Sequence, residues 1–166
     1  QAWQALDLTT RGTLQSLHAT AVIAGVPFDV AQRELERLGK RIEGMSSETR
    51  ALPSREGPGN VLMLEAASEN VCELFIAFGE RGLAAEKVAD RVAQETRAYL
   101  AGIAPVGEHL ADQLILPMAL AGRGSFVTHT LSSHLHTNID VVSRFLPVKI
   151  EVTQSEDGHR VDIHQC

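Results

Sequence analysis

The sequence has 166 residues, with 15 lysine and arginine residues against 21 aspartate and glutamate residues, for a formal net charge of −6. This length fits one domain or two small ones, and the acidic balance excludes a strongly basic nucleic-acid-binding surface over the whole chain. No apolar run approaches the roughly 18–20 residues that cross a bilayer, so we expect no membrane segment. Cys72 and Cys166 form no CxxC pair, which argues against a zinc-thiolate site and favours a reducing, cytoplasmic location.

The first hundred residues predict a small two-layer α/β domain with the order β-α-β-β-α. Apolar alternation indicates strands, apolar repeats every three or four residues indicate helices, and Ser, Gly and Pro clusters indicate loops. The predicted elements are a strand at 13–26, a helix at 28–42, a loop at 43–60, a hairpin of strands at 61–68 and 71–79, and a helix at 85–100. The predicted core consists of Leu35, Leu38, Leu62, Leu64, Leu74, Ile76, Val88 and Val92.

Residues 101–107 contain Gly and Pro and form the predicted domain boundary. Pro117 is expected to kink or end the helix that follows this boundary. The next helix is expected to begin with a capping box of Thr137 and Asp140, with Phe145 among its inward residues. The predicted elements after the boundary are a helix at 108–121, a strand at 125–131, a helix at 138–146 and a closing hairpin of VKIEVTQ and HRVDIHQ.

The segment 125–140 is the richest in side chains that could carry chemistry. His129 falls in the predicted strand, whereas His134 and His136 fall in the connection before the next helix. Such connections commonly hold anions, because the free N–H groups at a helix start favour negative charge. From the residues alone, three readings stay open: ordinary loop histidines, a metal site through His134 and His136, or a nucleophilic or acid–base histidine.

Two other segments have a functional and a structural reading. In 107–114, Asp112 and Gln113 could present a carboxylate and an amide to a ligand, although composition alone favours a solvated helix start. Asp112 lies four residues after Glu108 and shares its helix face. The glycines of GPGN at 57–60 could cradle phosphate, but no lysine completes a P-loop, so a turn before a strand is the better explanation.

Three stretches carry a specific resemblance: EGPGNVLMLEAASENV at 56–71, VGEHLADQLILPMALAG at 106–122 and LSSHLHTNIDVVSRFLPVKIEV at 131–152. In order and spacing they resemble the C-terminal half of RNA 3′-terminal phosphate cyclase. The resemblance implies an α+β architecture of two-layer sandwiches, in which helices pack on four-stranded sheets. Residues 9–101 would be a small inserted domain, and residues 1–8 and 102–166 would belong to the large catalytic domain.

The resemblance also implies roles for particular residues. His134 matches the family histidine that attacks the α-phosphorus of ATP and becomes adenylylated. The nucleotide-binding segment, usually Tyr-Leu-Ala-Asp-Gln in the family, would be His109, Leu110, Ala111, Asp112 and Gln113. Here His109 replaces the aromatic residue and offers less stacking area. His136 matches a position that is usually apolar, so it receives no role.

The implied activity is ATP-dependent conversion of an RNA 3′-phosphate to a 2′,3′-cyclic phosphate, through a histidine–AMP intermediate and with a divalent cation such as Mg or Mn, whose ligands are unknown. The expected partners are RNA 3′-phosphate ends and the N-terminal half of such an enzyme or another copy of the chain. The chain by itself is expected to be inactive. Two alternatives are a non-catalytic cyclase-like factor in ribosome biogenesis and, less well supported, a sugar-phosphate transferase of related architecture. The presence of His134 favours the enzyme.

Overall fold

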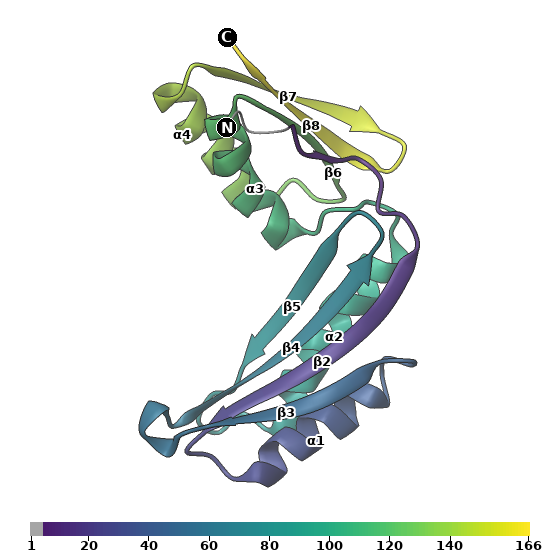
Figure 1. The fold of residues 1–166 in the computed structure, drawn as a ribbon, viewed down its shortest axis with the longest axis vertical. Helices are drawn as coiled ribbons and strands as arrows, with labels where there is room; N and C mark the ends of the chain where they lie inside the picture. The colour runs from purple at the N-terminus through teal and green to yellow at the C-terminus, as the bar shows by residue number, and fades with distance from the viewer. Residues whose placement is uncertain (1–4) are drawn as a thin grey trace. The chain divides into compact units, whose positions relative to one another are not determined.

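The computed structural model describes residues 5–166, which divide into two compact units (Figure 1). The α1–α2 unit consists of Leu14–Ser68 and Cys72–Ala101. The α3–α4 unit consists of residues 5–13, Glu69–Val71 and Gly102–Cys166. Each unit packs helices on a four-stranded sheet, which confirms the predicted mixed α/β class. Independent folding of residues 9–101 stays a prediction.

In the α1–α2 unit the sheet has the order β3-β2-β4-β5, and both helices cover the same face of it (Figure 1). β2 runs parallel to β3 and antiparallel to β4, which in turn runs antiparallel to β5. The elements are β2 (Leu14–Ala24), α1 (Phe28–Gly39), β3 (Ser46–Leu52), the 3₁₀ turn η1 (Ser54–Glu56), β4 (Gly59–Ser68), β5 (Cys72–Phe78) and α2 (Ala85–Ala101).

The core of this unit lies between the sheet and its two helices. Leu38, Leu62, Leu64, Val88 and Val92 are buried as predicted, and Leu35 packs partly buried against them. The prediction for Leu74 and Ile76 is wrong, because these side chains are 45% and 40% exposed on the other face of β5. Phe75 and Ala77 point to the helices instead. Since β5 carries apolar residues on both faces, its alternation could not reveal the inward face.

The loop predicted at 43–60 is also wrong in part, because it contains β3 and η1. β3 reads SSETRAL and has no fully buried side chain. It pairs on one side only, with β2, so it is an edge strand of the sheet. Polar side chains are common on edge strands, since they discourage pairing with other chains. Because of this polar composition, the sequence pattern predicts a loop here and not a strand.

In the α3–α4 unit, the two helices cover one face of a sheet with the order β1-β6-β8-β7 (Figure 1). Phe126, Ile115, Leu135 and Ile163 are the largest fully buried members of its core. The elements are β1 (Asp7–Leu8), α3 (Glu108–Ala121), β6 (Arg123–Thr128), α4 (Ser133–Phe145), β7 (Val148–Ser155) and β8 (Gly158–Gln165).

Helix α3 continues past Pro117 to Ala121, so the proline does not end it. The Pro117 side chain is exposed, and its ring therefore costs no core packing. The helix ends at Gly122, whose φ of 70° is the left-handed conformation that glycine adopts without strain. The Gly122 N–H is within hydrogen-bonding distance of the Ala119 and Met118 carbonyls, which helps to close the last turn.

Three details of residues 125–146 correct the predictions. Strand β6 ends at Thr128, so His129 lies just after the strand and is exposed. Helix α4 begins at Ser133, five residues before the predicted start, and is capped by Ser132 instead of Thr137. Phe145, predicted to point inward, is 82% exposed.

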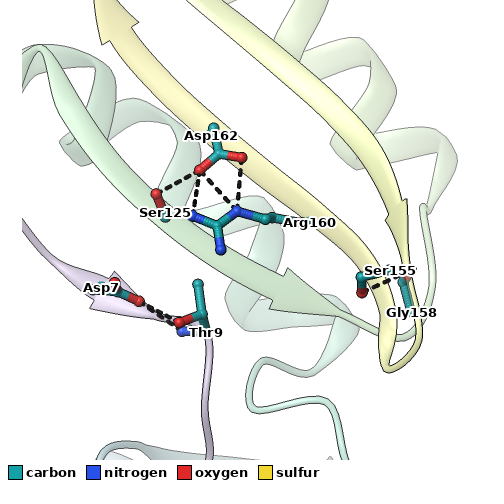
Figure 2. Close-up of polar contacts among 7 residues, drawn as sticks. All are labelled: Asp7, Thr9, Ser125, Ser155, Gly158, Arg160 and Asp162. Carbon is teal, nitrogen blue, oxygen red and sulfur yellow. Dashed lines mark hydrogen bonds and ion pairs between the residues drawn. The ribbon is translucent and has the colours of Figure 1, made fainter.

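The face of the second sheet opposite the helices carries a polar cluster (Figure 2). Asp162 on β8 accepts a hydrogen bond of 2.7 Å from the Ser125 hydroxyl on β6, and the Arg160 guanidinium binds both of its carboxylate oxygens. The hydrogen bonds from Arg160 hold the pKa of Asp162 below its ordinary value, and Ser125 adds to this effect. Asp162 is therefore ionised in this cluster, and its hydrogen bond with Ser125 stabilises the pairing of β8 with β6.

Within residues 5–166 no helix combines the length and apolar composition that crossing a bilayer requires.

Candidate functional site

The structure brings the predicted nucleotide-binding segment on α3 to the start of α4. Asp112 makes the connection with two different groups. Its carboxylate Oδ1 accepts a hydrogen bond of 3.1 Å from the Ser132 hydroxyl, and its backbone carbonyl accepts one of 3.3 Å from the Asn138 amide. Ser132 and Asn138 lie two residues before and four residues after His134. The two candidate segments, far apart in the sequence, are therefore neighbours in the fold.

Ser132 has a second role as the N-cap of α4. Its Oγ accepts a hydrogen bond of 3.0 Å from the backbone N–H of Leu135, and its φ and ψ of −67° and 159° are extended, as a cap requires. The hydroxyl thus accepts from the helix and donates to Asp112 at the same time. This arrangement fixes the first turn of α4 against α3, and His134 is the second residue of that turn.

The His134 side chain is exposed, and it makes no hydrogen bond or ion pair with any of residues 5–166. The first backbone N–H groups of a helix have no acceptor inside the helix, and together with the helix dipole they favour an anion nearby. His134 therefore stands free beside a group of donors suited to phosphoryl oxygens. A histidine placed in this way can approach a phosphorus atom without first breaking a contact.

The exposed side chains of both helices form continuous stripes. On α3, His109, Gln113, Leu116 and Leu120 follow the spacing of four, three and four that keeps residues on one helix face. On α4, His134 shares a face with the exposed Val141 and Phe145, seven and eleven residues further on. The polar candidate residues therefore stand at the N-terminal ends of two apolar stripes.

The remaining members of the segment 109–113 divide into packing and surface residues. Ala111 is fully buried and belongs to the core, and Leu110 packs partly buried against that core. His109 and Gln113 are exposed and free to meet a ligand. Pro117 has no N–H to donate to the Gln113 carbonyl four residues earlier, so the usual helical hydrogen bond to that carbonyl is missing. In this segment, the side chains of His109 and Gln113 are therefore the two that lie exposed at the surface.

His136 differs from His134 although both lie in the first turns of α4 and not in a loop. Two residues along a helix turn it by about 200°, so the two imidazoles project from opposite sides. This spacing does not suit a shared metal ion. Within the described part of the chain, no three His, Cys, Asp or Glu side chains gather closely enough to hold one.

Two residues that organise the site, Ser132 and Asn138, are not among the candidates predicted from the sequence. Ser132 precedes the helix by one position, and serine is among the preferred N-cap residues. That preference was a usable signal. Nothing in the sequence, however, indicates that the same hydroxyl donates to Asp112 twenty residues earlier. The Asn138 contact likewise depends on how α3 and α4 pack.

The chain is similar to proteins named RNA 3′-terminal phosphate cyclase along most of its length. The family model for the insert domain of RNA 3′-terminal phosphate cyclase (RTC) matches residues 9–101, which is more than half of the chain. The protein named RNA 3′-terminal phosphate cyclase in Ralstonia nicotianae is 50% identical over 159 residues, covering 96% of this chain and 46% of the relative. Proteins of the same name are 48% identical in Salmonella typhimurium, over 95% of this chain and 47% of the relative, and 46% identical in Ectopseudomonas mendocina, over 99% and 49%.

The chain therefore belongs to the RNA 3′-terminal phosphate cyclase family, and the predicted family is confirmed. It spans about half the length of the curated relatives it matches.

Proposed function

We propose that this chain supplies the adenylate-forming half of an RNA 3′-terminal phosphate cyclase, with His134 as the nucleophile. The observation that carries the proposal is the pair of hydrogen bonds from Ser132 and Asn138 to Asp112, because they hold the segment 109–113 beside His134. The names of the relatives support the reaction class.

The proposed reaction has three steps. A neutral imidazole nitrogen of His134 attacks the α-phosphorus of ATP, so that an N–P bond forms and pyrophosphate leaves. An oxygen of the RNA 3′-phosphate then attacks the same phosphorus, which frees the histidine and leaves AMP joined to the RNA. Finally, the 2′-hydroxyl oxygen attacks the 3′-phosphate phosphorus and loses its proton, and AMP departs as the 2′,3′-cyclic phosphate closes.

The residues around His134 have distinct proposed tasks. The N–H groups at the start of α4 stabilise the phosphoryl oxygens as negative charge builds on them. The exposed side chains of His109 and Gln113 bind the nucleotide, and Asp112 positions the start of α4 through Ser132. A divalent cation would offset charge on the triphosphate. Because the described side chains gather no ligand set, we assign it no ligand in this chain and route no step through it.

The test is covalent labelling by ATP carrying ³²P at the α-phosphate, followed by denaturing electrophoresis and mapping of the labelled peptide. It requires a full-length family protein that carries residues 1–166 of this sequence. We expect the label on the peptide that contains His134. Absence of label would favour the non-catalytic cyclase-like factor or the sugar-phosphate transferase, since neither forms an adenylate on histidine.

The chain by itself is expected to label poorly and to self-associate. Residues 102–166 hold four basic residues, and two of them, Lys149 and Arg160, are already paired with Glu151 and Asp162. Few cations are therefore left to bind a triphosphate. Leu116, Leu120, Val141 and Phe145 expose between 47% and 82% of their surface, which favours association with another copy or with the rest of the enzyme.

Size-exclusion chromatography of residues 1–166, with an ATP-labelling assay on each fraction, measures both expectations. Replacing Phe145 and Leu120 with serine is expected to shift the chain toward monomer. A monomer that labels at His134 would contradict the expectation and would mean that the catalytic site is complete in this chain. The expected cytoplasmic location stays a prediction.

A further inference from the structure

The packing of α1 on α2 contains a ladder of arginine–carboxylate ion pairs, one pair for each helical turn. The third step of this ladder has an arginine but no acidic partner of its own. Arg33 binds both carboxylate oxygens of Glu86 at 2.8 Å, and Arg37 binds both oxygens of Asp90 at 2.8 and 3.1 Å. These arginines follow one another by four residues along α1, as the two acids do along α2. The next positions in the same rhythm are Arg41 on the α1 side and Gln94 on the α2 side.

At this third step the acidic partner is missing. Arg41 reaches back to Asp90, with Nη2 at 3.3 Å from an Oδ1 that Arg37 already binds at 2.8 Å. Gln94 is neutral, and Arg97, one turn further along the same face of α2, adds a positive charge. The Arg97 side chain makes no hydrogen bond or ion pair within residues 5–166. The guanidinium groups of Arg41 and Arg97 therefore share a surface with one carboxylate, that of Asp90. Arg37 already neutralises the charge of this carboxylate.

These side chains enclose a hollow of about 340 Å³, lined by Arg41, Asp90, Ala93, Gln94 and Arg97. That space is large enough for a phosphate group together with its bound water. Guanidinium groups suit this ligand, because their planar N–H donors match two phosphate oxygens at once. The Gln94 amide can add a further neutral donor.

We propose that this hollow binds a phosphodiester group of an RNA strand, through Arg41, Arg97 and Gln94. The anion supplies the negative charge that the third step of the ladder lacks. The preference for phosphate rests on the hollow alone, whereas the choice of RNA as its source rests on the proposed function. The hollow lies in the α1–α2 unit, whereas His134 belongs to the α3–α4 unit, so none of the residues that line the hollow is among those proposed to react.

The test measures binding of a fluorescein-labelled ten-nucleotide RNA with a 3′-hydroxyl end to residues 1–166, by anisotropy at several KCl concentrations. This RNA cannot be cyclised, so the result does not depend on adenylylation. Arg97→Gln is the main variant, because Arg97 has no partner to lose. Arg81→Gln is the matched control, since Arg81 is an exposed arginine of the same unit outside the hollow.

We expect Arg97→Gln to weaken RNA binding about tenfold, as loss of a charge-assisted contact does, and to reduce the slope of log affinity against log salt by about 0.7. Arg81→Gln should change affinity less than about twofold. Equal effects of the two variants would overturn the site. Competition by millimolar inorganic phosphate as strong as that by unlabelled RNA, at equal phosphate concentration, would overturn RNA as the source. Absence of ATP labelling in the full-length family protein, with RNA binding by residues 1–166 intact, would contradict only the proposed function.

Discussion

Replacing His134 with alanine is expected to abolish covalent labelling by ATP and cyclisation of RNA 3′-phosphates in a full-length family protein that carries this sequence. Removing the nucleophile of a covalent mechanism typically lowers the rate by more than about a thousandfold. His136 cannot replace it, because that side chain projects from the other side of α4, about 200° away. The measurement is ³²P incorporation from ATP, together with conversion of an RNA 3′-phosphate to its cyclic form.

His136→Ala is the matched control, because it removes another exposed imidazole from the same turn of the helix. It should retain labelling and cyclisation close to the unaltered protein. The stability of both variants should be similar, since neither side chain is buried. If His134→Ala were labelled as well as His136→Ala, the assignment of the nucleophile would be wrong.

The second large effect concerns Glu34, a fully buried carboxyl in the core-facing side of α1. Its Oε1 accepts a hydrogen bond from the Asn60 side chain, and its Oε2 has no hydrogen-bond partner in the described structure. Burial raises the pKa of Glu34 from an ordinary value of 4.5 to about 7, although the Asn60 hydrogen bond acts in the opposite direction. A buried, half-satisfied carboxylate is costly, so the folded chain prefers the protonated form.

The sign of the pH dependence follows from this raised pKa. Below pH 4.5 the carboxyl is protonated in the folded and unfolded chains alike, so it does not lower the free energy of unfolding. As the pH rises from 4.5 toward 7, the unfolded chain ionises first, and stability falls. Above about pH 7 the loss is complete and amounts to about 3 kcal/mol.

Glu34→Gln is therefore expected to remove this loss. The variant should be more stable than the unaltered chain by about 3 kcal/mol at pH 8 and nearly equal to it at pH 4.5. Urea unfolding followed by circular dichroism at both pH values, at equal protein concentration, measures the difference. Glu36→Gln, two residues along α1 and exposed, should show no such pH-dependent gain. A gain of the same size at both pH values would contradict ionisation as the cause.

The sequence by itself determined most of the secondary structure and the family. The alternation in 13–26 and the stripe in 85–100 became β2 and α2, because strong periodicity leaves one way to bury each apolar face. Helix α3 has the predicted bounds 108–121. The motif residues from 109 to 113 and His134 also followed from the sequence alone, as candidates whose roles stay predictions.

Only the tertiary structure decided the inward face of β5, the start of α4 and the contacts of Asp112. Leu74 and Phe75 are both apolar, so the packing of α1 and α2 on one face of the sheet chose between them. Ser132 begins α4 because its hydroxyl caps Leu135 and also reaches Asp112 on α3. Such contacts join residues far apart in the chain, and local periodicity carries no information about them.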